Sequence, residues 1–400
     1  MNRSLSLIGM GEDGFDGLSA GARTLIAEAD VIVGSGRLLG LLPPLSAALY
    51  NWPSPFDPMV DRIRDWVDKR VVILATGDPM NYGVGALLAP RLKHDLKIIP
   101  APSAFSLAAA RMGWSLPDVE MISLHGRNIS LIEPVIAPGV KILALSEGDE
   151  TVRAVAQHLV ERDYGESAIT VLEHMGGPLE RCASCKASEM PQQRFADLST
   201  IAVECTAGPG AVLLSRVPGL PDDLYVHDGQ LTKREVRAIT LSALSPVANA
   251  LLWDVGAGCG SISIEWIRAV RSARAIAFES DEQRSRMISE NARRLGAPDI
   301  TIITGKAPEV LANQPTPDAV FLGGAMSNDA VFDAAWRALR SGGRFVANAV
   351  TLEGEAALCR RHRAHGGEIL RIDTAHVVAL GTKRALRPRL AVLQWQARKP

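Results

Sequence analysis

The chain has 400 residues, of which 47% are hydrophobic, 22% are charged and 5% are aromatic, and its formal net charge is −1. This composition fits a globular protein long enough for two domains, and the near-zero charge excludes a general attraction to nucleic acid or anionic membranes. The longest uncharged stretch, near Ala238–Trp253, is interrupted by Ser, Thr, Pro and Asn, which argues against a membrane span.

Short runs rich in β-branched residues alternate with helix-like or loop segments through the first half of the chain. Over Leu5–Pro100 this alternation predicts an α/β fold with a mostly parallel sheet, and further strand candidates follow. The predicted strands are Leu5–Ile8, Val31–Val33, Val71–Ala75, Leu96–Pro100, Val119–Leu124, Lys141–Leu145, Ile169–Glu173 and Ile201–Thr206. The first strand begins close to Met1 with no signal-peptide pattern before it, so we expect a cytoplasmic protein.

Five cysteines at irregular positions indicate reduced thiols. Cys182 and Cys185 form a C-x-x-C pair, which raises the question of a metal or redox centre. A zinc site needs four ligands, but no second pair with suitable spacing follows, and His174 is the only nearby histidine. We therefore expect no metal.

The stretch Arg216–Gln230 is rich in Pro, Gly and Asp, which is typical of a linker, and a second α/β series follows it. The sequence therefore predicts a first domain over residues 1–215, a linker over 216–230 and a second domain over 231–400.

A glycine-rich turn opens the second series. Leu251–Trp266 reads as strand, tight turn and helix start, with glycines at every second position from Gly256 to Gly260. A dinucleotide-binding fingerprint needs a glycine at 261, where this chain has Ser261. The predicted strand Ala275–Phe278 ends in Glu279, whose carboxylate can accept hydrogen bonds from both hydroxyls of a ribose. S-adenosylmethionine, which lacks a pyrophosphate, fits better than NAD. A tight turn with an unrelated acid after it is the alternative.

Two later segments extend this pattern. Thr301–Ile303 and Gly305-Lys-Ala-Pro308-Glu309 resemble the strand and adenine-side loop of class I methyltransferases. The predicted strand Ala319–Leu322 ends in Gly323-Gly324. Methyltransferases that act on amino groups often carry Asn/Asp-Pro-Pro-Tyr there, so its absence disfavours an amino-group target.

Four motifs then occur in order: Thr232-Lys-Arg-Glu-Val-Arg-Ala238, the glycine turn, Gly305–Glu309 and Gly343-Arg-Phe-Val-Ala-Asn-Ala-Val-Thr-Leu-Glu353. Together they resemble the decarboxylating precorrin C15-methyltransferase family over roughly residues 225–400. The resemblance implies a Rossmann-like class I methyltransferase domain.

The first half carries its own series of motifs. They are Gly9-Met-Gly11, Thr76-Gly-Asp-Pro79, Pro102-Ser-Ala104, Ser123-Leu-His-Gly-Arg127, Glu173-His-Met-Gly-Gly177 and Glu180-Arg181. In this order they resemble the class III tetrapyrrole methylases, in particular the precorrin C5-methyltransferase family, over roughly residues 1–215. That family more often has Gly-x-Gly-Pro-Gly at the first motif, where this chain has Glu12 and Asp13. The resemblance implies two α/β subdomains with a cleft.

The whole chain thus resembles a fusion of the two families. This implies that it methylates C5 and C15 of precorrin-6B/6Y and decarboxylates the ring C acetate to give precorrin-8, in cobalamin biosynthesis. It also implies two S-adenosylmethionine sites per chain, no nucleic-acid or membrane partner, and a homo-oligomer. The implied cofactor-binding residues are Gly9, Gly11, Thr76, Gly77, Asp78, Pro79, Ser103, His125, Thr232, Asp254, Gly256, Ala257, Gly258, Cys259, Gly260, Glu279, Ala307 and Pro308. The implied substrate-binding residues are Gly323, Gly324, Asn348 and Thr351.

Methyl transfer from a sulfonium mainly needs positioning and a dry cavity, and the enamine-like meso carbon needs no strong base. Decarboxylation calls for one proton, for which His125, His227 and His376 are candidates, although a structural role explains each as well. The stretch Cys359–Pro400 has ten Lys/Arg against two Asp/Glu. Its arginines are either carboxylate-binding groups or a solvated, charge-protected surface. They include Arg360, Arg361, Arg363, Arg384, Arg387 and Arg389.

Two other functions remain open from the sequence. One is an RNA methyltransferase whose first half recruits the substrate, against which stand the neutral charge and the few aromatic residues. The other makes the first half a noncatalytic ligand-sensing module.

Overall fold

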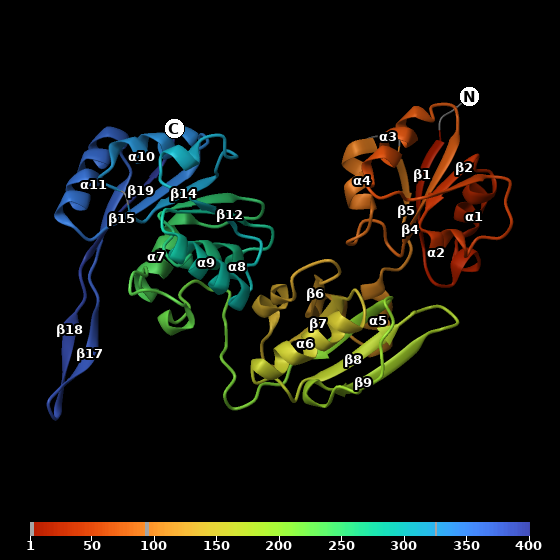
Figure 1. The fold of residues 1–400 in the computed structure, drawn as a ribbon, viewed down its shortest axis with the longest axis horizontal. Coiled ribbons are helices and arrows are strands. Elements are labelled where there is room, and N and C mark those ends of the chain that lie inside the picture. The colour runs from red at the N-terminus through yellow and green to blue at the C-terminus, as the bar shows by residue number, and fades with distance from the viewer. Residues whose placement is uncertain (1–3, 93–95, 325) are drawn as a thin grey trace. The chain divides into compact units, whose positions relative to one another are not determined.

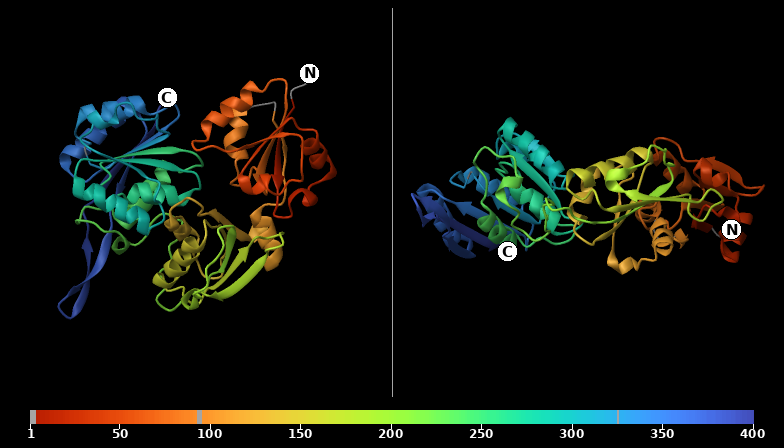
Figure 2. Two further views of the ribbon diagram at one scale, coloured as in Figure 1. Left: turned by 45° about the vertical axis from the view of Figure 1, so that its right-hand side comes forward. Right: turned by 90° about the horizontal axis from the view of Figure 1, so that it is seen from below.

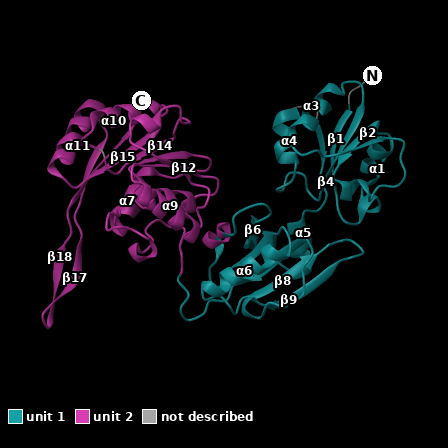
Figure 3. Ribbon diagram, in the orientation of Figure 1, with its two compact units in different colours: residues 1–129, 135–212 teal, residues 130–134, 213–400 magenta. Residues whose placement is uncertain are grey.

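The computed structural model describes residues 4–92, 96–324 and 326–400, and the chain divides into two compact units (Figure 3). Unit 1 comprises Met1–Ile129 and Val135–Val212, and unit 2 comprises Ser130–Pro134 and Leu213–Pro400. The segment that the sequence marks as a linker therefore packs within unit 2, where Leu220 and Tyr225 are buried.

A five-stranded parallel sheet forms the first part of unit 1, in the order β3-β2-β4-β1-β5 (Figure 1). Successive side chains of a strand point to opposite faces, so Leu5 and Leu7 of β1 pack with α3 and α4, whereas Ile8 and Met10 pack with α1 and α2. The strands are β1 (Ser4–Met10), β2 (Val31–Gly34), β3 (Ala48–Asn51), β4 (Arg70–Thr76) and β5 (Leu96–Ile99). The helices are α1 (Ala20–Ala27), α2 (Gly36–Leu39), α3 (Asp57–Asp65) and α4 (Gly85–Leu92).

The second part of unit 1 is a mixed sheet in the order β6-β7-β10-β8-β9, in which only β6 and β7 pair in parallel. Phe105 and Ala108 of α5 pack against it, and α6 buries Val152 and Val155. The strands are β6 (Val119–Ser123), β7 (Lys141–Leu145), β8 (Ala168–Glu173), β9 (Arg181–Lys186) and β10 (Ser199–Glu204). The helices are α5 (Ala104–Met112) and α6 (Asp149–Glu161).

Unit 2 is built on a seven-stranded sheet in the order β13-β12-β11-β14-β15-β19-β16. The first five strands in this order pair in parallel, and β19 runs antiparallel to β15 and β16. The strands are β11 (Leu251–Val255), β12 (Arg274–Glu279), β13 (Thr301–Thr304), β14 (Ala319–Leu322), β15 (Arg344–Ala349), β16 (Glu368–Ile372) and β19 (Val392–Arg398). The helices are α7 (Arg234–Leu244), α8 (Ser261–Ala269), α9 (Glu282–Arg294), α10 (Asp329–Ala338) and α11 (Leu352–His365).

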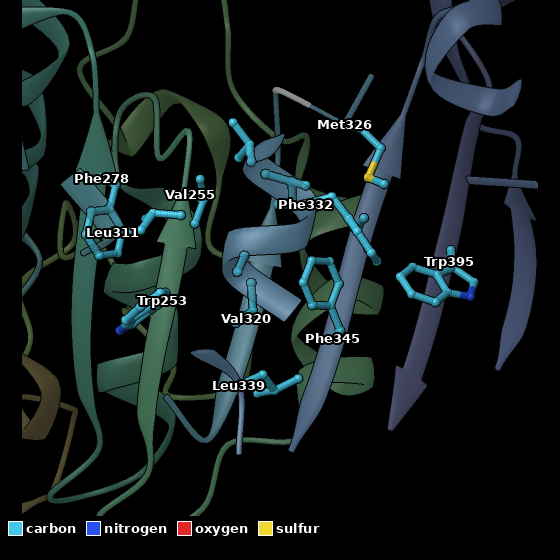
Figure 4. Packing of buried hydrophobic residues seen from close by; sticks show 14 of the residues in the cluster. Trp253, Val255, Phe278, Leu311, Val320, Met326, Phe332, Leu339, Phe345 and Trp395 are labelled. Atoms are coloured by element: carbon cyan, nitrogen blue, oxygen red, sulfur yellow. The ribbon is translucent and has the colours of Figure 1, made fainter. Parts of the chain in front are cut away.

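Helices cover both faces of this sheet, α7, α8 and α9 on one and α10 and α11 on the other. Figure 4 shows the second face, where aromatic side chains fill the space between sheet and helices. The ring centroids of Phe332 and Phe345 are 5.1 Å apart, and those of Phe345 and Trp395 are 5.6 Å apart. This packing holds β14 and β15 in place, and with them the edge of the sheet at which both strands end.

A two-stranded antiparallel hairpin, β17 (Ala375–Leu380) and β18 (Lys383–Pro388), stands apart from the sheets. It extends away from the seven-stranded sheet of unit 2 (Figures 1 and 2). Among the described residues, no helix combines the length and the apolar character needed to span a membrane.

The predicted α/β fold is confirmed, and each strand predicted from the sequence overlaps a strand of the structure. Strand β9, which the sequence did not predict, contains Cys182 and Cys185. Residues three apart in a strand lie on opposite faces, so the two thiols cannot bind one ion together. The described residues hold no cluster of three or more His, Cys, Asp or Glu side chains suited to a metal ion.

Candidate active sites

Unit 2 contains a cavity of about 1000 Å³ at the carboxyl ends of β11, β12, β14 and β15. Strand order changes direction between β11 and β14, and ligands of open parallel sheets bind outside the carboxyl ends of the strands at such a point. The lining comes from the turn after β11, from the ends of the other strands and from a segment before α7.

The turn after β11 depends on glycine. Gly256, Gly258 and Gly260 have φ of 74°, 61° and 82°, a region that other residues rarely adopt. A Cβ on Gly260 would lie 2.8 Å from the side chain of Ile288, so this glycine allows the turn to pack against α9. Of the described residues, a Cβ on Gly258 would meet only Gln230, whose carbonyl oxygen would lie 3.7 Å away, and it would otherwise point into open space. Gly258 thus keeps the backbone exposed to a ligand.

Glu279 holds this turn and lines the cavity. Its Oε2 accepts a hydrogen bond from the Gly258 N–H at 2.8 Å, and its Oε1 accepts from the N–H groups of Ser280 and Asp281 at 2.8 and 3.0 Å. A carboxylate oxygen has two acceptor positions, so Oε2 keeps one for a ligand hydroxyl. The side chain therefore both shapes the turn and offers an acceptor to the cavity.

Asp254 lies behind the turn, wholly buried and outside the cavity lining. Its Oδ2 accepts from the N–H and hydroxyl of Ser263 at 3.1 and 2.7 Å, which fixes the start of α8 to β11. Burial raises the pKa of Asp254 to about 6. Oδ1 has no hydrogen-bond partner in the described parts of the chain, which fits a carboxyl group that is protonated in acid.

We expect Asp254→Asn to change how stability depends on pH. The folded pKa is raised, so this carboxyl stabilises the fold fully below its unfolded pKa of about 3.8 and loses that contribution as the pH rises through about 6. The variant should therefore gain up to about 3 kcal/mol relative to the unmodified chain between pH 4 and pH 7. Urea unfolding of both proteins across this range measures the difference, and parallel pH profiles would contradict it.

A segment that we call the strap, residues 219–233, forms another wall of the cavity, to which Gly229–Lys233 contribute. Two charged side chains with almost no exposure hold its first half. Glu265 of α8 accepts from the N–H of Leu220 at 3.0 Å and from the hydroxyl of Tyr225 at 2.9 Å. Arg237 of α7 donates to Glu265 at 2.6 Å and to the carbonyl of Thr232 at 2.6 Å. Because Thr232 lines the cavity, the same side chain also fixes the cavity wall.

Asn291 of α9 ties the strap to the glycine turn. Its amide oxygen accepts from the N–H of Val226 at 2.8 Å, and its amide nitrogen donates to the carbonyls of Val226 and Cys259 at 2.9 and 3.0 Å. One fully buried side chain thus holds two walls of the cavity together.

Unit 1 has a cavity of about 610 Å³, lined by residues of both of its sheets. The parallel sheet contributes Gly11 after β1 and Thr76–Asp78 at the end of β4, and the mixed sheet contributes Ser123 and Leu172. Gly77 has a φ of 58°, and Asp78 accepts from the N–H of Met80 at 2.8 Å, which closes the turn. Ser103 caps α5 by accepting from the N–H of Ser106.

Glu12 connects the two parts of unit 1 beside this cavity. It forms an ion pair with Arg37 of α2 and accepts from Nδ1 of His174, after β8, at 3.0 Å. Arg37 also donates to the hydroxyl of Thr76 at 2.8 Å. A Cβ on Gly177 would lie 2.6 Å from that of Glu12, so a glycine is needed for this approach.

The turn that carries His174 is held from behind. Glu180 accepts two hydrogen bonds from Arg111 of α5, at 2.6 and 2.9 Å, and one from the Gly176 N–H at 2.8 Å. These bonds lower the pKa of Glu180 to about 2, and the hydrogen bonds from Arg111 have the largest effect. The carboxyl group is therefore ionised at neutral pH.

Comparison with known proteins matches both halves of the chain. The family model described as "Precorrin methyltransferase domain" matches residues 223–399, and that described as "Tetrapyrrole (Corrin/Porphyrin) Methylases" matches residues 4–191. A precorrin-6Y C(5,15)-methyltransferase [decarboxylating] of a Sinorhizobium species is 44% identical, over 98% of this chain and 95% of the relative. The chain belongs to this family.

One further relative and one solved structure are similar to this chain. A protein of Mycobacterium tuberculosis strain H37Rv with the same name is 38% identical over 98% of this chain and 99% of its own length. The solved structure of the C-terminal domain of the precorrin-6Y C5,15-methyltransferase from Rhodobacter capsulatus is 44% identical. It covers 46% of this chain and 100% of that domain, with a TM-score of 0.44.

Many residues that the family resemblance implied lie together in the cavities. Those that line the unit 2 cavity are Thr232, Gly256, Ala257, Gly258, Cys259, Glu279, Gly323, Gly324, Asn348 and Thr351. Those that line the unit 1 cavity are Gly11, Thr76, Gly77, Asp78, Ser103 and His125.

The other implied residues lie outside both linings: Gly9, Pro79, Asp254, Gly260, Ala307 and Pro308. The proton-donor candidates His227 and His376 also lie outside them. Gly9 is needed for packing, because a Cβ there would lie 2.0 Å from the carbonyl oxygen of Gly77. His227 closes a turn by accepting from the N–H of Gly229 at 2.9 Å. His376 lies on the hairpin strand β17.

Several lining residues carry no local sequence signal. In unit 2 they include Gln230, Arg284 and Met326, and in unit 1 they include Trp52 and Tyr82. Arg127 and His174 also line the unit 1 cavity; both lie in motifs of the first half, but no role of their own followed from the sequence. For the strap residues, the family motif that begins at Thr232 is the sequence signal that points to the cavity. The arginines of the basic tail Cys359–Pro400 differ in their surroundings. Arg389 lines the cavity. Arg361 instead pairs with Asp329 and lies over the ring of Phe332.

Proposed function

We propose that this chain is an S-adenosylmethionine-dependent C-methyltransferase of cobalamin biosynthesis that methylates C5 and C15 of precorrin-6B/6Y and decarboxylates the ring C acetate to give precorrin-8. The observation that carries the proposal is that each unit has its own cavity at the glycine-bearing carboxyl edge of a parallel sheet. Two separate cavities suit two methylations, and the relatives' names give both positions and the decarboxylation.

The motif resemblances assign one reaction to each unit. Unit 1 would methylate C5, and unit 2 would methylate C15 and release carbon dioxide. The acetate that is lost sits on ring C beside the C15 bridge, so the two steps of unit 2 share one conjugated segment. The tetrapyrrole is the proposed partner. A nucleic-acid partner is not proposed, because the relatives bear the names of precorrin enzymes.

The unit 2 cavity suits the methyl donor at its glycine turn. The acceptor that Oε2 of Glu279 keeps would take a ribose hydroxyl, and the open backbone of Gly256–Cys259 would lie against the donor. In unit 1, Gly11, the Thr76–Asp78 turn, Ser103 and His125 would form the corresponding site.

Bound S-adenosylmethionine supplies an activated methyl group to a carbon that is already nucleophilic. The chain's own part is to align the two carbons and to exclude water. Asn348 is suited to orient the substrate, because bonds to Thr240 and Gln394, both 2.9 Å long, fix its side chain at the cavity wall. No histidine stands among the described residues of the unit 2 lining, so a histidine proton donor is not proposed for the decarboxylation.

Mass spectrometry of the product tests the function. Incubation of the chain with the purified tetrapyrrole and S-adenosylmethionine should add two methyl groups and remove one carbon dioxide. A product with the methyl groups but without decarboxylation would contradict the assignment, as would transfer to RNA with none to the tetrapyrrole.

Calorimetric titration with S-adenosylmethionine should give two sites per chain. Glu279→Ala should weaken only one of them, by about 1–3 kcal/mol, because the acceptor and the support of the Gly258 N–H are both lost. Glu290→Ala, which removes an exposed carboxylate from α9, is the matched control and should leave both sites unchanged. A single site in the unmodified chain would contradict the prediction.

The homo-oligomer also remains a prediction, which light scattering during size-exclusion chromatography would measure.

A further inference from the structure

Among the described residues of the unit 2 lining, Lys233 and Arg389 are cations without a close carboxylate partner. Within the described residues, Lys233 makes no ion pair, and Nη1 of Arg389 reaches only Oδ2 of Asp222, at 3.9 Å. That carboxylate already accepts a hydrogen bond from the buried Arg237 at 3.1 Å. Positive charge at a cavity wall is costly to desolvate unless an anion compensates it, so both side chains are available to an anionic ligand.

The other charges of this cavity are already matched. Arg284 pairs with Asp228 at 2.8 Å, and Glu279 is engaged by three backbone N–H groups. In the basic tail outside the cavity, Arg361 pairs with Asp329 and Arg371 pairs with Asp373. The unmatched positive charge at the lining therefore belongs to Lys233 and Arg389.

Packing holds together the two segments that carry Lys233 and Arg389. Lys233 directly precedes α7, and Arg389 follows β18. Val236 of α7 forms one buried cluster with Ile372 and Val392, which hold the base of the hairpin against this helix.

Two apolar side chains of the described lining are exposed. Val350 and Leu390 line the cavity, and 51% and 77% of their surfaces are exposed. Ligand pockets are lined mainly by apolar side chains, so these two groups are suited to lie against a ligand. A flat ring system with carboxylate arms would cover Val350 and Leu390 while its arms reach the two cations.

We propose that Lys233 and Arg389 bind carboxylates of the tetrapyrrole in the C15 reaction, with Val350 and Leu390 against its ring system. The inference rests on the proposed function. The pair serves carboxylates that the product retains, because a cation on the departing carboxylate would stabilise its ionised form and oppose the loss of carbon dioxide.

Lys233→Gln and Arg389→Gln test the proposal in the full chain. Each should raise the KM for the tetrapyrrole in C15 methylation and carbon dioxide release about 10- to 100-fold. This is the change expected when one hydrogen bond between charged groups is lost. We expect kcat and the donor Kd to change less than about threefold, because the contacts are made equally in the ground state. Lys233→Arg keeps the charge and should restore most of the affinity.

The matched control is Lys383→Gln, an exposed cation of β18 outside the cavity lining, which should leave all of these values unchanged. Absorbance titration of the tetrapyrrole provides affinity without turnover, and circular dichroism checks the fold of each variant.

Each outcome has a distinct meaning. Unchanged KM and unchanged tetrapyrrole affinity in both Gln variants would overturn the inference alone. A rise in donor Kd that accounts for the loss would also overturn it, because the carboxylate bound would then be that of the donor's methionine. Failure of the unmodified chain to turn over the tetrapyrrole would overturn the proposed function, and the inference with it.

Discussion

Gly258→Arg should abolish C15 methylation and carbon dioxide release while C5 methylation continues. Gly258 has a φ of 61°, and a Cβ at this position points into the unit 2 cavity. An arginine there would occupy the space of the methyl donor and bring a positive charge to the place of a sulfonium. We expect a loss of at least about 100-fold, because small misplacements of reacting groups already cost that much. Mass spectrometry should find one added methyl group and no loss of carbon dioxide.

Gly342→Arg is the matched control for this variant. Gly342 has a φ of 74°, and a Cβ on it would have no heavy atom of the described residues within 4 Å, so the backbone strain of the two substitutions is similar. Gly342 lies in the turn before β15, outside the cavity lining, and its variant should therefore keep both methylations. Carbon dioxide release at the original rate by folded Gly258→Arg protein would refute the assignment of the decarboxylation to unit 2.

The complementary change is Asp78→Arg at the unit 1 cavity. It removes the acceptor for the Met80 N–H and places a long side chain in the lining. C5 methylation should be lost, while C15 methylation and decarboxylation persist. Loss of all three would show that unit 2 acts only on C5-methylated substrate.

Arg237→Met should lower the free energy of unfolding of unit 2 by about 3–5 kcal/mol, because it leaves the buried carboxylate of Glu265 without its cation. The bonds to Leu220 and Thr232 are lost as well, so the strap should loosen and the donor affinity of this unit should fall. Urea unfolding and calorimetric titration measure the two effects.

Arg286→Met provides the matched comparison on α9. Arg286 and its partner Glu282 are both 80% exposed, so we expect a change below about 1 kcal/mol. Equal destabilisation by the two substitutions would contradict the role given to the buried pair. Replacing Arg237 and Glu265 together by Met and Leu should recover part of the loss, because no unpaired charge is then left in the core.

The sequence by itself determined the features that depend on neighbouring residues. Short runs of strand-forming residues predicted β1, β4, β7 and β14, and alternate glycines predicted the turn after β11. Glu279 was found because a parallel strand pair places the end of β12 beside that turn. A short motif carries such information because its residues fold against one another or against the next strand along the chain.

Only the tertiary structure decided which residues share a cavity when they are distant in sequence. Arg237 and Glu265 meet across two helices, and nothing in Arg216–Gln230, rich in Pro and Gly, shows that it packs as a wall. Arg389 looks like the other arginines of the tail until the hairpin base packs against α7. Long-range pairing depends on burial and on the partner's position, and these arise only when the whole sheet and its helices assemble.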